Sequence, residues 1–139
     1  MKTLTDETVS RVRFNEVDSV GIVWHGNFVQ YLEDGRESWG EKYNFSYQDM
    51  YKNGFVAPIV KVDIDYKSML KHNDRFRIVT TYENTDAAKM VFKYELYKLP
   101  ENILVAKATT VQVFMNLNKE LMLQNPEFVT RWKQKYNLL

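Results

Sequence analysis

The strongest constraint on how this chain folds is a long amphipathic stripe that begins at about Gly26. Apolar side chains and one glycine recur there at spacings of three and four, the period of one helix face: Phe28, Tyr31, Leu32, Gly35, Trp39 and Tyr43. Gly35 is unexpected, because glycine costs about 1 kcal/mol relative to alanine in a helix. Close approach of the helix to the element beneath it would account for a glycine there. The stripe therefore predicts a long helix lying across a sheet.

Much of the remaining chain alternates apolar with polar residues, as strands do. In the segment 60–67 every second residue is apolar and the others are charged, which predicts a half-buried antiparallel strand at a sheet edge. Similar patterns predict further strands at 9–14, 76–82, 90–96 and from 103 to about 117, the last after a turn at 99–102. This order predicts an α+β fold in which a single antiparallel sheet wraps around one long central helix.

Two shorter helices are indicated by their capping residues. Ser46 and Asp49 form a capping-box-like pair, and Gly54 is placed to end the helix that they begin. Near the C-terminus, Asn125 has the character of an N-cap and Pro126 that of the first helical residue. The apolar face of that last helix consists of Phe128, Trp132 and Tyr136.

The amino-acid composition limits the classes of protein to which this chain can belong. A chain of 139 residues, 45% of them hydrophobic, can bury a real core, and we expect a single domain over residues 1–139. The 19 Lys and Arg nearly balance the 18 Asp and Glu, which argues against nucleic acid as a partner. The chain has no cysteine, so disulfides and cysteine nucleophiles are excluded. No apolar run resembles a signal peptide or a transmembrane segment, so we expect a cytoplasmic protein.

The common catalytic motifs are missing from the sequence. No G-x-S-x-G elbow occurs, and the five glycines form neither a P-loop nor a dinucleotide fingerprint. His25 and His72 are far apart and belong to no metal-binding motif, so we expect neither a metal nor a cofactor. A hydrolase with this sequence would therefore use a carboxylate, as a general base on water or as the nucleophile.

One carboxylate stands out by its position. Asp18 lies in a loop, and Gly21 and His25 lead from it into the start of the long helix. The unpaired N–H groups of a helix N-terminus can polarise a carbonyl, so a base held there suits acyl transfer. Judged on spacing alone, Asp18 is more simply a turn aspartate, and Glu16 nearby is a solvated loop residue.

The same segment resembles the motif of a known family. The small bacterial acyl-CoA thioesterase branch of the 4-hydroxybenzoyl-CoA thioesterase superfamily has the hotdog fold and usually carries the run D-x-x-G-x-V-x-H-x-N-Y. The matching residues are Asp18, Gly21, Val23, His25 and Asn27, with Phe28 in place of the tyrosine. The resemblance extends over roughly residues 9–117. It implies a hotdog fold and an acyl-CoA thioester hydrolase that releases a carboxylic acid and free coenzyme A.

The resemblance also implies roles for the matched residues. Asp18 aligns with the catalytic carboxylate of related thioesterases. His25 would orient the substrate or assist proton transfer, and the alternative is a histidine that caps or packs at the helix start. Gly26 and Asn27 would supply backbone N–H groups to the thioester oxygen, or Asn27 would be only a helix cap.

The family pattern also draws attention to a second carboxylate and to two positions at which this sequence differs from the usual residue. A related hotdog branch carries its catalytic carboxylate within the helix, where Glu33 lies here. Glu33 is more simply a solvated residue that pairs with Arg36 or Glu37. Val17 stands where the family usually has threonine, which removes a hydroxyl near the site, and Met69 stands where it usually has proline.

Coenzyme A carries several phosphate charges, so its site needs cations. Lys71 matches a position that is often basic in the family, and Arg75 and Lys67 are weaker candidates. Candidates for lining the acyl pocket are Trp24, Phe28, Tyr31 and Tyr47. Aromatic residues at helical spacing are more often part of a core.

Two rival functions stand beside the thioesterase. A hotdog enoyl hydratase or dehydratase also uses a carboxylate and a histidine, usually closer together than the seven positions between Asp18 and His25. A non-catalytic module that binds acyl-CoA or acyl carrier protein would keep the pocket without the chemistry. We also expect a homodimer or homotetramer, because the edge strand predicted at 60–67 would otherwise be an association liability.

Overall fold

A computed structural model describes residues 3–139 of the protein. Its elements in chain order are β1 (Leu4–Arg11), a short 3-10 helix η1 (Phe14–Glu16), α1 (Asn27–Lys42), α2 (Tyr47–Lys52), β2 (Phe55–Val56), β3 (Ile59–Tyr66), β4 (Arg75–Glu83), β5 (Lys89–Lys98), β6 (Ile103–Val113), β7 (Met115–Asn116) and α3 (Glu127–Lys135). Five strands form one antiparallel sheet in the order β1-β4-β5-β6-β3, and β2 pairs with β7 in a separate two-stranded sheet.

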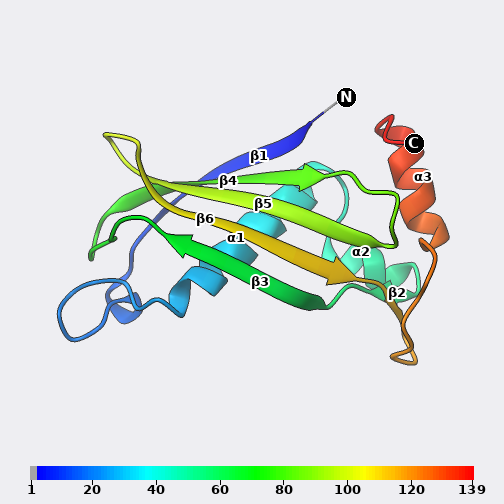
Figure 1. The fold of residues 1–139 in the computed structure, drawn as a ribbon, viewed down its shortest axis with the longest axis horizontal. Coiled ribbons are helices and arrows are strands. Elements are labelled where there is room, and N and C mark those ends of the chain that lie inside the picture. The colour runs from blue at the N-terminus through cyan, green and yellow to red at the C-terminus, as the bar shows by residue number, and fades with distance from the viewer. Residues whose placement is uncertain (1–2) are drawn as a thin grey trace.

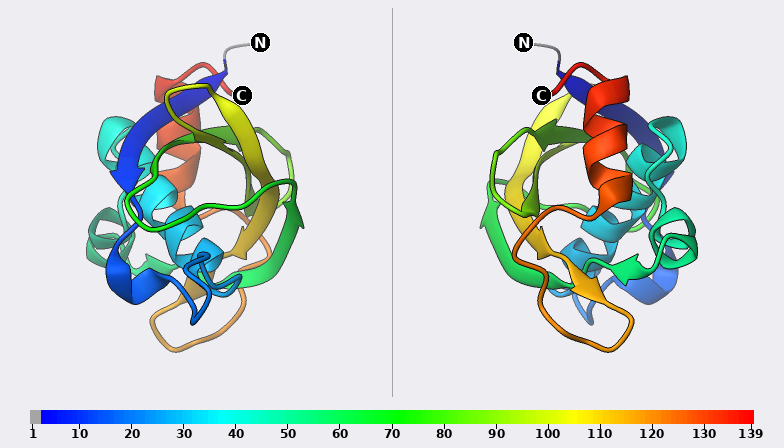
Figure 2. Two further views of the ribbon diagram at one scale, coloured as in Figure 1. Left: turned by 90° about the vertical axis from the view of Figure 1, so that its left-hand side faces the viewer. Right: turned by 90° about the vertical axis from the view of Figure 1, so that its right-hand side faces the viewer.

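The large sheet curves around helix α1, which lies across its inner face (Figures 1 and 2). This arrangement confirms the predicted α+β hotdog fold, with an antiparallel sheet wrapped around one long helix. The prediction of a single sheet is incomplete, because the pair β2–β7 joins two segments of only two residues each. Segments that short have too few residues to establish a period of two.

Helix α1 buries the stripe that the sequence predicted. Tyr31, Leu32 and Trp39 are each at most 3% exposed. Gly35 marks a close approach of the helix to β4, because a Cβ atom there would lie 2.6 Å from Thr80 Oγ1 and 2.7 Å from Ile78 Cγ2. This contact confirms the expected reason for a glycine in the stripe.

Arg36 is an unpredicted member of the buried face of α1. Its side chain is only 1% exposed, and burial lowers the pKa of its guanidinium. Nε donates to Gln112 Oε1 at 3.0 Å and Nη1 to the Phe45 carbonyl at 3.2 Å. Among the described residues Arg36 forms no ion pair, so the interpretation of Glu33 as its partner is wrong.

The predicted strands are confirmed except at three places. β1 begins at Leu4 and ends at Arg11, earlier than the predicted 9–14, although the Val12 N–H still donates to the carbonyl of Asp74, the next residue in register on the β4 side, at 2.8 Å. β6 ends at Val113, and the buried Phe114 separates it from β7. β3 lies at a sheet edge, as predicted, but is not half-buried within one chain, because Val60 and Val62 are 60% and 41% exposed.

The predicted capping box of α2 is present. Ser46 Oγ accepts the Asp49 N–H at 3.1 Å, and Asp49 Oδ2 accepts the Ser46 N–H at 3.0 Å. Gly54 follows the helix with φ +84°, a conformation that favours glycine. At α3 the prediction is early by one residue, because Pro126 occupies the N-cap position and the helix begins at Glu127.

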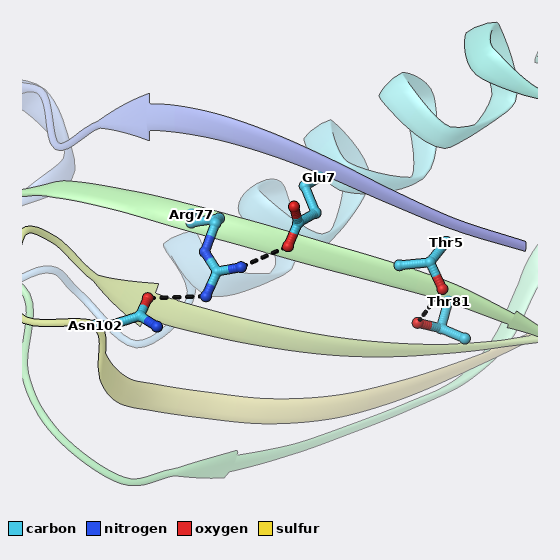
Figure 3. Close-up of polar contacts among 5 residues, drawn as sticks. All are labelled: Thr5, Glu7, Arg77, Thr81 and Asn102. Carbon is cyan, nitrogen blue, oxygen red and sulfur yellow. Dashed lines mark hydrogen bonds and ion pairs between the residues drawn. The ribbon is translucent and has the colours of Figure 1, made fainter.

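The outer face of the large sheet carries polar contacts between β1, β4 and the β5–β6 turn (Figure 3). Arg77 on β4 forms an ion pair with Glu7 on β1, and its Nη2 donates to Asn102 Oδ1 at 2.8 Å. Thr5 and Thr81, which are cross-strand partners, share a hydroxyl hydrogen bond of 3.2 Å. These contacts hold β1 to the sheet on the side away from α1.

Helix α3 lies at the end of the molecule away from the loop that precedes α1 (Figure 1). Trp132 of α3 packs edge-on against Phe45, with ring centroids 4.9 Å apart, and its indole N–H donates to the Tyr43 carbonyl at 2.8 Å. The aromatic face predicted for this helix is therefore in contact with the core. None of the helices in residues 3–139 is long and apolar enough to cross a membrane.

Candidate active site

Asp18 stands in a tight hairpin of residues 17–23, called here the Asp18 hairpin. Val17 and Val23 pair as an antiparallel bridge, and the Asp18 N–H donates to the Ile22 carbonyl at 2.8 Å. The Gly21 N–H closes the turn on the Asp18 carbonyl at 3.0 Å, and Gly21 has φ +80°. The glycine of the motif thus provides a backbone conformation that other residues rarely adopt.

The two oxygens of the Asp18 carboxylate have different environments. Oδ1 accepts the Val20 N–H at 2.9 Å and the Ile22 N–H at 3.3 Å. Oδ2 accepts no hydrogen bond from residues 3–139, and the residue is exposed. The turn role that spacing alone favoured is therefore present, and it leaves one oxygen free to meet water or substrate.

The first turn of α1 has fewer unpaired backbone N–H groups than the motif implied. The Asn27 N–H donates to the Trp24 carbonyl at 2.9 Å, and the Phe28 N–H to the His25 carbonyl at 3.2 Å. The Gly26 N–H donates to no acceptor in the described residues. Gly26 itself is the N-cap residue, so the alternative of Asn27 as the helix cap is wrong. Gly26 is the better candidate for an oxyanion donor.

Trp24 and His25 lie on the surface between the Asp18 hairpin and α1. The Trp24 side chain is 53% exposed, and its indole ring covers Gly26 closely enough that a Cβ atom there would overlap it. The His25 ring tilts against the indole at a centroid distance of 5.2 Å. The His25 carbonyl also accepts the Tyr66 hydroxyl from β3 at 2.9 Å. The edge strand thereby holds the start of the helix.

Glu16 is the residue that sequence reasoning missed. The interpretation as a solvated loop residue is wrong, because its carboxylate is partly buried and accepts the Tyr31 hydroxyl at 3.0 Å. Its backbone carbonyl accepts the Asn27 side-chain amide at 2.7 Å. Tyr31 lies fifteen positions along the chain, so no local pattern pointed to this contact.

Lys71 lies beside the Asp18 hairpin. It forms a bridge with Ile22, and the neighbouring Leu70 carbonyl accepts the Val23 N–H at 2.9 Å. Arg75 begins β4 and stands directly opposite Arg11 of β1. Lys71, Arg75 and Arg11 are all exposed. Arg11 was not among the predicted cations.

The four aromatic candidates divide into two pairs. Phe28 and Tyr31 belong to the core, and their side chains are 3% and 1% exposed. This agrees with the interpretation that aromatic residues at helical spacing are part of a core. Trp24 and Tyr47 are exposed, and the Tyr47 hydroxyl donates to Glu33 Oε2 at 3.5 Å. Within residues 3–139, no group of three or more His, Cys, Asp and Glu side chains is arranged to hold a metal.

Comparison with known proteins assigns the chain to a family. Residues 12–133 match the family model described as the thioesterase-like superfamily. The chain belongs to this superfamily and is, by class, a thioester hydrolase.

Individual relatives agree with this assignment. A Bacillus subtilis protein, provisionally named an acyl-CoA thioesterase, is 30% identical over 125 residues, 90% of either chain. A 1,4-dihydroxy-2-naphthoyl-CoA hydrolase of Synechocystis is 28% identical over 118 residues, 84% of either chain. The structure of a DHNA-CoA thioesterase from Staphylococcus aureus has the same fold, with a TM-score of 0.86, 24% identity, and coverage of 96% of this chain and 89% of that one.

Proposed function

We propose that this protein hydrolyses acyl-CoA thioesters to a carboxylic acid and free coenzyme A, with Asp18 as the catalytic carboxylate. The carboxylate itself carries the proposal: one oxygen is held by two backbone N–H groups, and the other is free. A fixed base with an open oxygen, followed in the chain by a helix N-terminus, has the parts that thioester hydrolysis needs. The two relatives described above are both named for hydrolysis of coenzyme A thioesters, which supports the same carrier here.

In the proposed reaction, Asp18 Oδ2 takes a proton from a water molecule as that water attacks the thioester carbonyl carbon. The Gly26 N–H and the positive end of the α1 dipole stabilise the oxyanion that forms. Collapse of the tetrahedral intermediate breaks the C–S bond, and the proton on Asp18 passes to the departing thiolate. His25, exposed beside this position, orients the substrate or assists the proton transfer.

The alternative role of the same carboxylate is direct attack on the carbonyl carbon. That route expels the thiolate first and leaves an anhydride between the acyl group and Asp18, which water then hydrolyses. A single turnover in ¹⁸O-labelled water can detect the anhydride route. Attack of water on the anhydride at the aspartyl carbon leaves ¹⁸O on Asp18, whereas the general-base route leaves the protein unlabelled.

For coenzyme A, we propose that Lys71, Arg75 and Arg11 contact the phosphates. Lys71 lies against the Asp18 hairpin, and Arg75 faces Arg11 across the β1–β4 ladder. Like charges directly opposite one another in a sheet are unfavourable unless an anion lies between them. A phosphate group at this end of the sheet would relieve that repulsion.

We also propose that the active form is a homodimer or a dimer of dimers in which β3 meets β3 of a second copy. The exposed Val60 and Val62 share their strand face with Tyr66, whose ring packs edge-on against Phe28 of α1. This face therefore continues the inner, apolar side of the sheet beyond the part that α1 covers. A second copy would cover this face, and we propose that the acyl group binds where the two copies meet.

The test is release of free thiol by the purified protein across short-chain, long-chain and aromatic acyl-CoAs. We expect turnover of at least one class, unchanged after dialysis against EDTA because no metal or other cofactor is proposed. Parallel assays with acyl carrier protein thioesters identify the carrier. Acyl-CoA binding without turnover of any substrate would overturn the proposal in favour of a binding module. Hydration of an enoyl-CoA without thiol release would favour the hydratase.

A further inference from the structure

The Glu16 side chain connects the chain just before Asp18 to the second turn of helix α1. Its Oε1 accepts the Tyr31 hydroxyl at 3.0 Å and the Arg13 N–H at 2.8 Å. The Arg13 bond closes the 3-10 turn η1, and the Tyr31 bond reaches across to the helix. One carboxylate oxygen thus joins the loop to α1.

The backbone carbonyl of Glu16 makes a second connection to the same helix. It accepts the Asn27 side-chain amide at 2.7 Å and the Trp24 N–H at 3.1 Å. Asn27 and Tyr31 are four residues apart in α1, so they stand on one helix face. Glu16 is therefore bound to the first and second turns of the helix at once.

Tyr31 is a rigid partner for this contact. Its side chain is 1% exposed, and its ring packs against Phe76 of β4 and Phe28 at centroid distances of 4.6 and 5.6 Å. Burial and the nearby Glu16 carboxylate raise the pKa of Tyr31, so its hydroxyl remains a proton donor. The contact with Tyr31 therefore fixes the position of Glu16 relative to the core between α1 and the sheet.

We infer that Glu16 and Tyr31 are positioning residues that hold the Asp18 hairpin against the N-terminus of α1. Asp18 makes hydrogen bonds only within its own hairpin among residues 3–139. The place of its free oxygen relative to Gly26 therefore depends on the contacts that anchor the hairpin from outside. A misplacement of about 1 Å can cost about 10²-fold in rate. This inference rests on the proposed function of Asp18.

A competing role for Glu16 is that of the base itself. The two roles differ in what glutamine does at this position. Glutamine retains the Oε1 acceptor for Tyr31 and Arg13 but cannot take a proton. A positioning role therefore predicts that Glu16→Gln rescues the function that Glu16→Ala loses, whereas a base is lost in both variants.

The experiment compares kcat and KM for thiol release in the full-length wild type, Glu16→Ala, Glu16→Gln and Tyr31→Phe. We expect kcat to fall about 10²-fold in Glu16→Ala and about 10-fold in Tyr31→Phe, with KM changed by less than about twofold. Glu16→Gln should keep kcat within about threefold of wild type. Combining Glu16→Ala with Tyr31→Phe should cost no more than Glu16→Ala alone, because both remove the same contact.

The matched control is Tyr43→Phe. Its hydroxyl also donates a hydrogen bond, here to the Thr5 backbone carbonyl at 2.8 Å, but at the opposite end of α1. This variant should lose comparable stability and keep kcat. Hydrogen exchange gives a readout without substrate: the hydrogen-bonded amides of Asp18, Gly21 and Trp24 should lose protection in Glu16→Ala and Tyr31→Phe, and not in Tyr43→Phe.

The possible results distinguish a failure of the positioning role from a failure of the proposed function. Glu16→Gln as inactive as Glu16→Ala, or Glu16→Ala as active as wild type, would overturn the inference. Should Glu16→Ala not fold, Tyr31→Phe and Glu16→Gln decide it: a normal kcat in Tyr31→Phe would overturn the inference. An inactive wild type would instead count against the proposed function, and the exchange measurement would still decide whether Glu16 anchors the hairpin.

Discussion

At the scale of single residues, Asp18→Asn is the most direct test of the chemistry. Asparagine keeps an oxygen for the Val20 and Ile22 N–H groups but cannot act as a base or nucleophile. We expect kcat to fall by about 10²–10⁴-fold, while acyl-CoA binding survives because the carboxylate acts mainly in the transition state. Thiol release and thermal unfolding of the same preparation provide the measurement.

A matched control for Asp18 is Asp49→Asn in the capping box of α2. Asp49 also accepts a backbone N–H, that of Ser46 at 3.0 Å, but in helix α2 rather than in the Asp18 hairpin. It should lose a little stability and no activity. A folded Asp18→Asn variant within a few-fold of wild-type kcat would refute Asp18 as the catalytic carboxylate and direct attention to Glu33.

The basic side chains proposed to contact the coenzyme A phosphates should affect substrate binding and not the rate of the chemical step. Lys71→Ala and Arg75→Ala should each raise KM and flatten its dependence on salt, with kcat nearly unchanged, because the phosphates are held equally in ground and transition states. Lys52→Ala, at the exposed end of α2, is the control and should behave as wild type. An unchanged KM in Lys71→Ala would move the phosphate site elsewhere.

At the scale of elements, the packing of α1 on β4 depends on Gly35. Gly35→Ala gains about 1 kcal/mol of helix propensity. The new Cβ would lie 2.6 Å from Thr80 Oγ1, however, and forcing two packed elements apart typically costs about 1–3 kcal/mol. We therefore expect a lower free energy of unfolding in a denaturant titration. Ser38→Ala, a further helical substitution in α1 outside the fully buried stripe, should not be destabilised in the same way. A Gly35→Ala variant as stable as wild type would show that the helix shifts freely.

At the scale of the whole molecule, the exposed edge strand β3 predicts association. We expect light scattering at micromolar concentration to give a dimer or a tetramer. Val62→Lys should weaken that assembly and lower activity, because it places a charge on an apolar face that a second copy would cover. Val9→Lys is the matched control: Val9 is an exposed valine, 49% exposed, on the other edge strand β1. A monomeric wild type would remove the shared-site proposal.

Features whose signals are periodic or lie within a few residues could be predicted from the sequence. The helix stripe, the capping box of Ser46 and Asp49, and the alternating strands are of this kind. The Asp18 motif was recognised for the same reason, since its residues lie within a span of ten positions. Gly35 was predicted to mark a close approach, because a glycine in an apolar helical stripe loses stability that close packing against a neighbouring element can offset.

Only the tertiary structure decided the contacts between distant parts of the chain. The buried Arg36 donates from Nε at 3.0 Å to Gln112, seventy-six positions away. Glu16 is an anchor rather than a solvated residue because the fold brings the Tyr31 hydroxyl to it. The pairing of β2 with β7 is likewise non-local. Local sequence determines which segments become helix or strand, through period and capping. Which polar groups find partners is decided only when the sheet closes around α1, because burial makes an unpaired polar group costly and selects the arrangement that satisfies it.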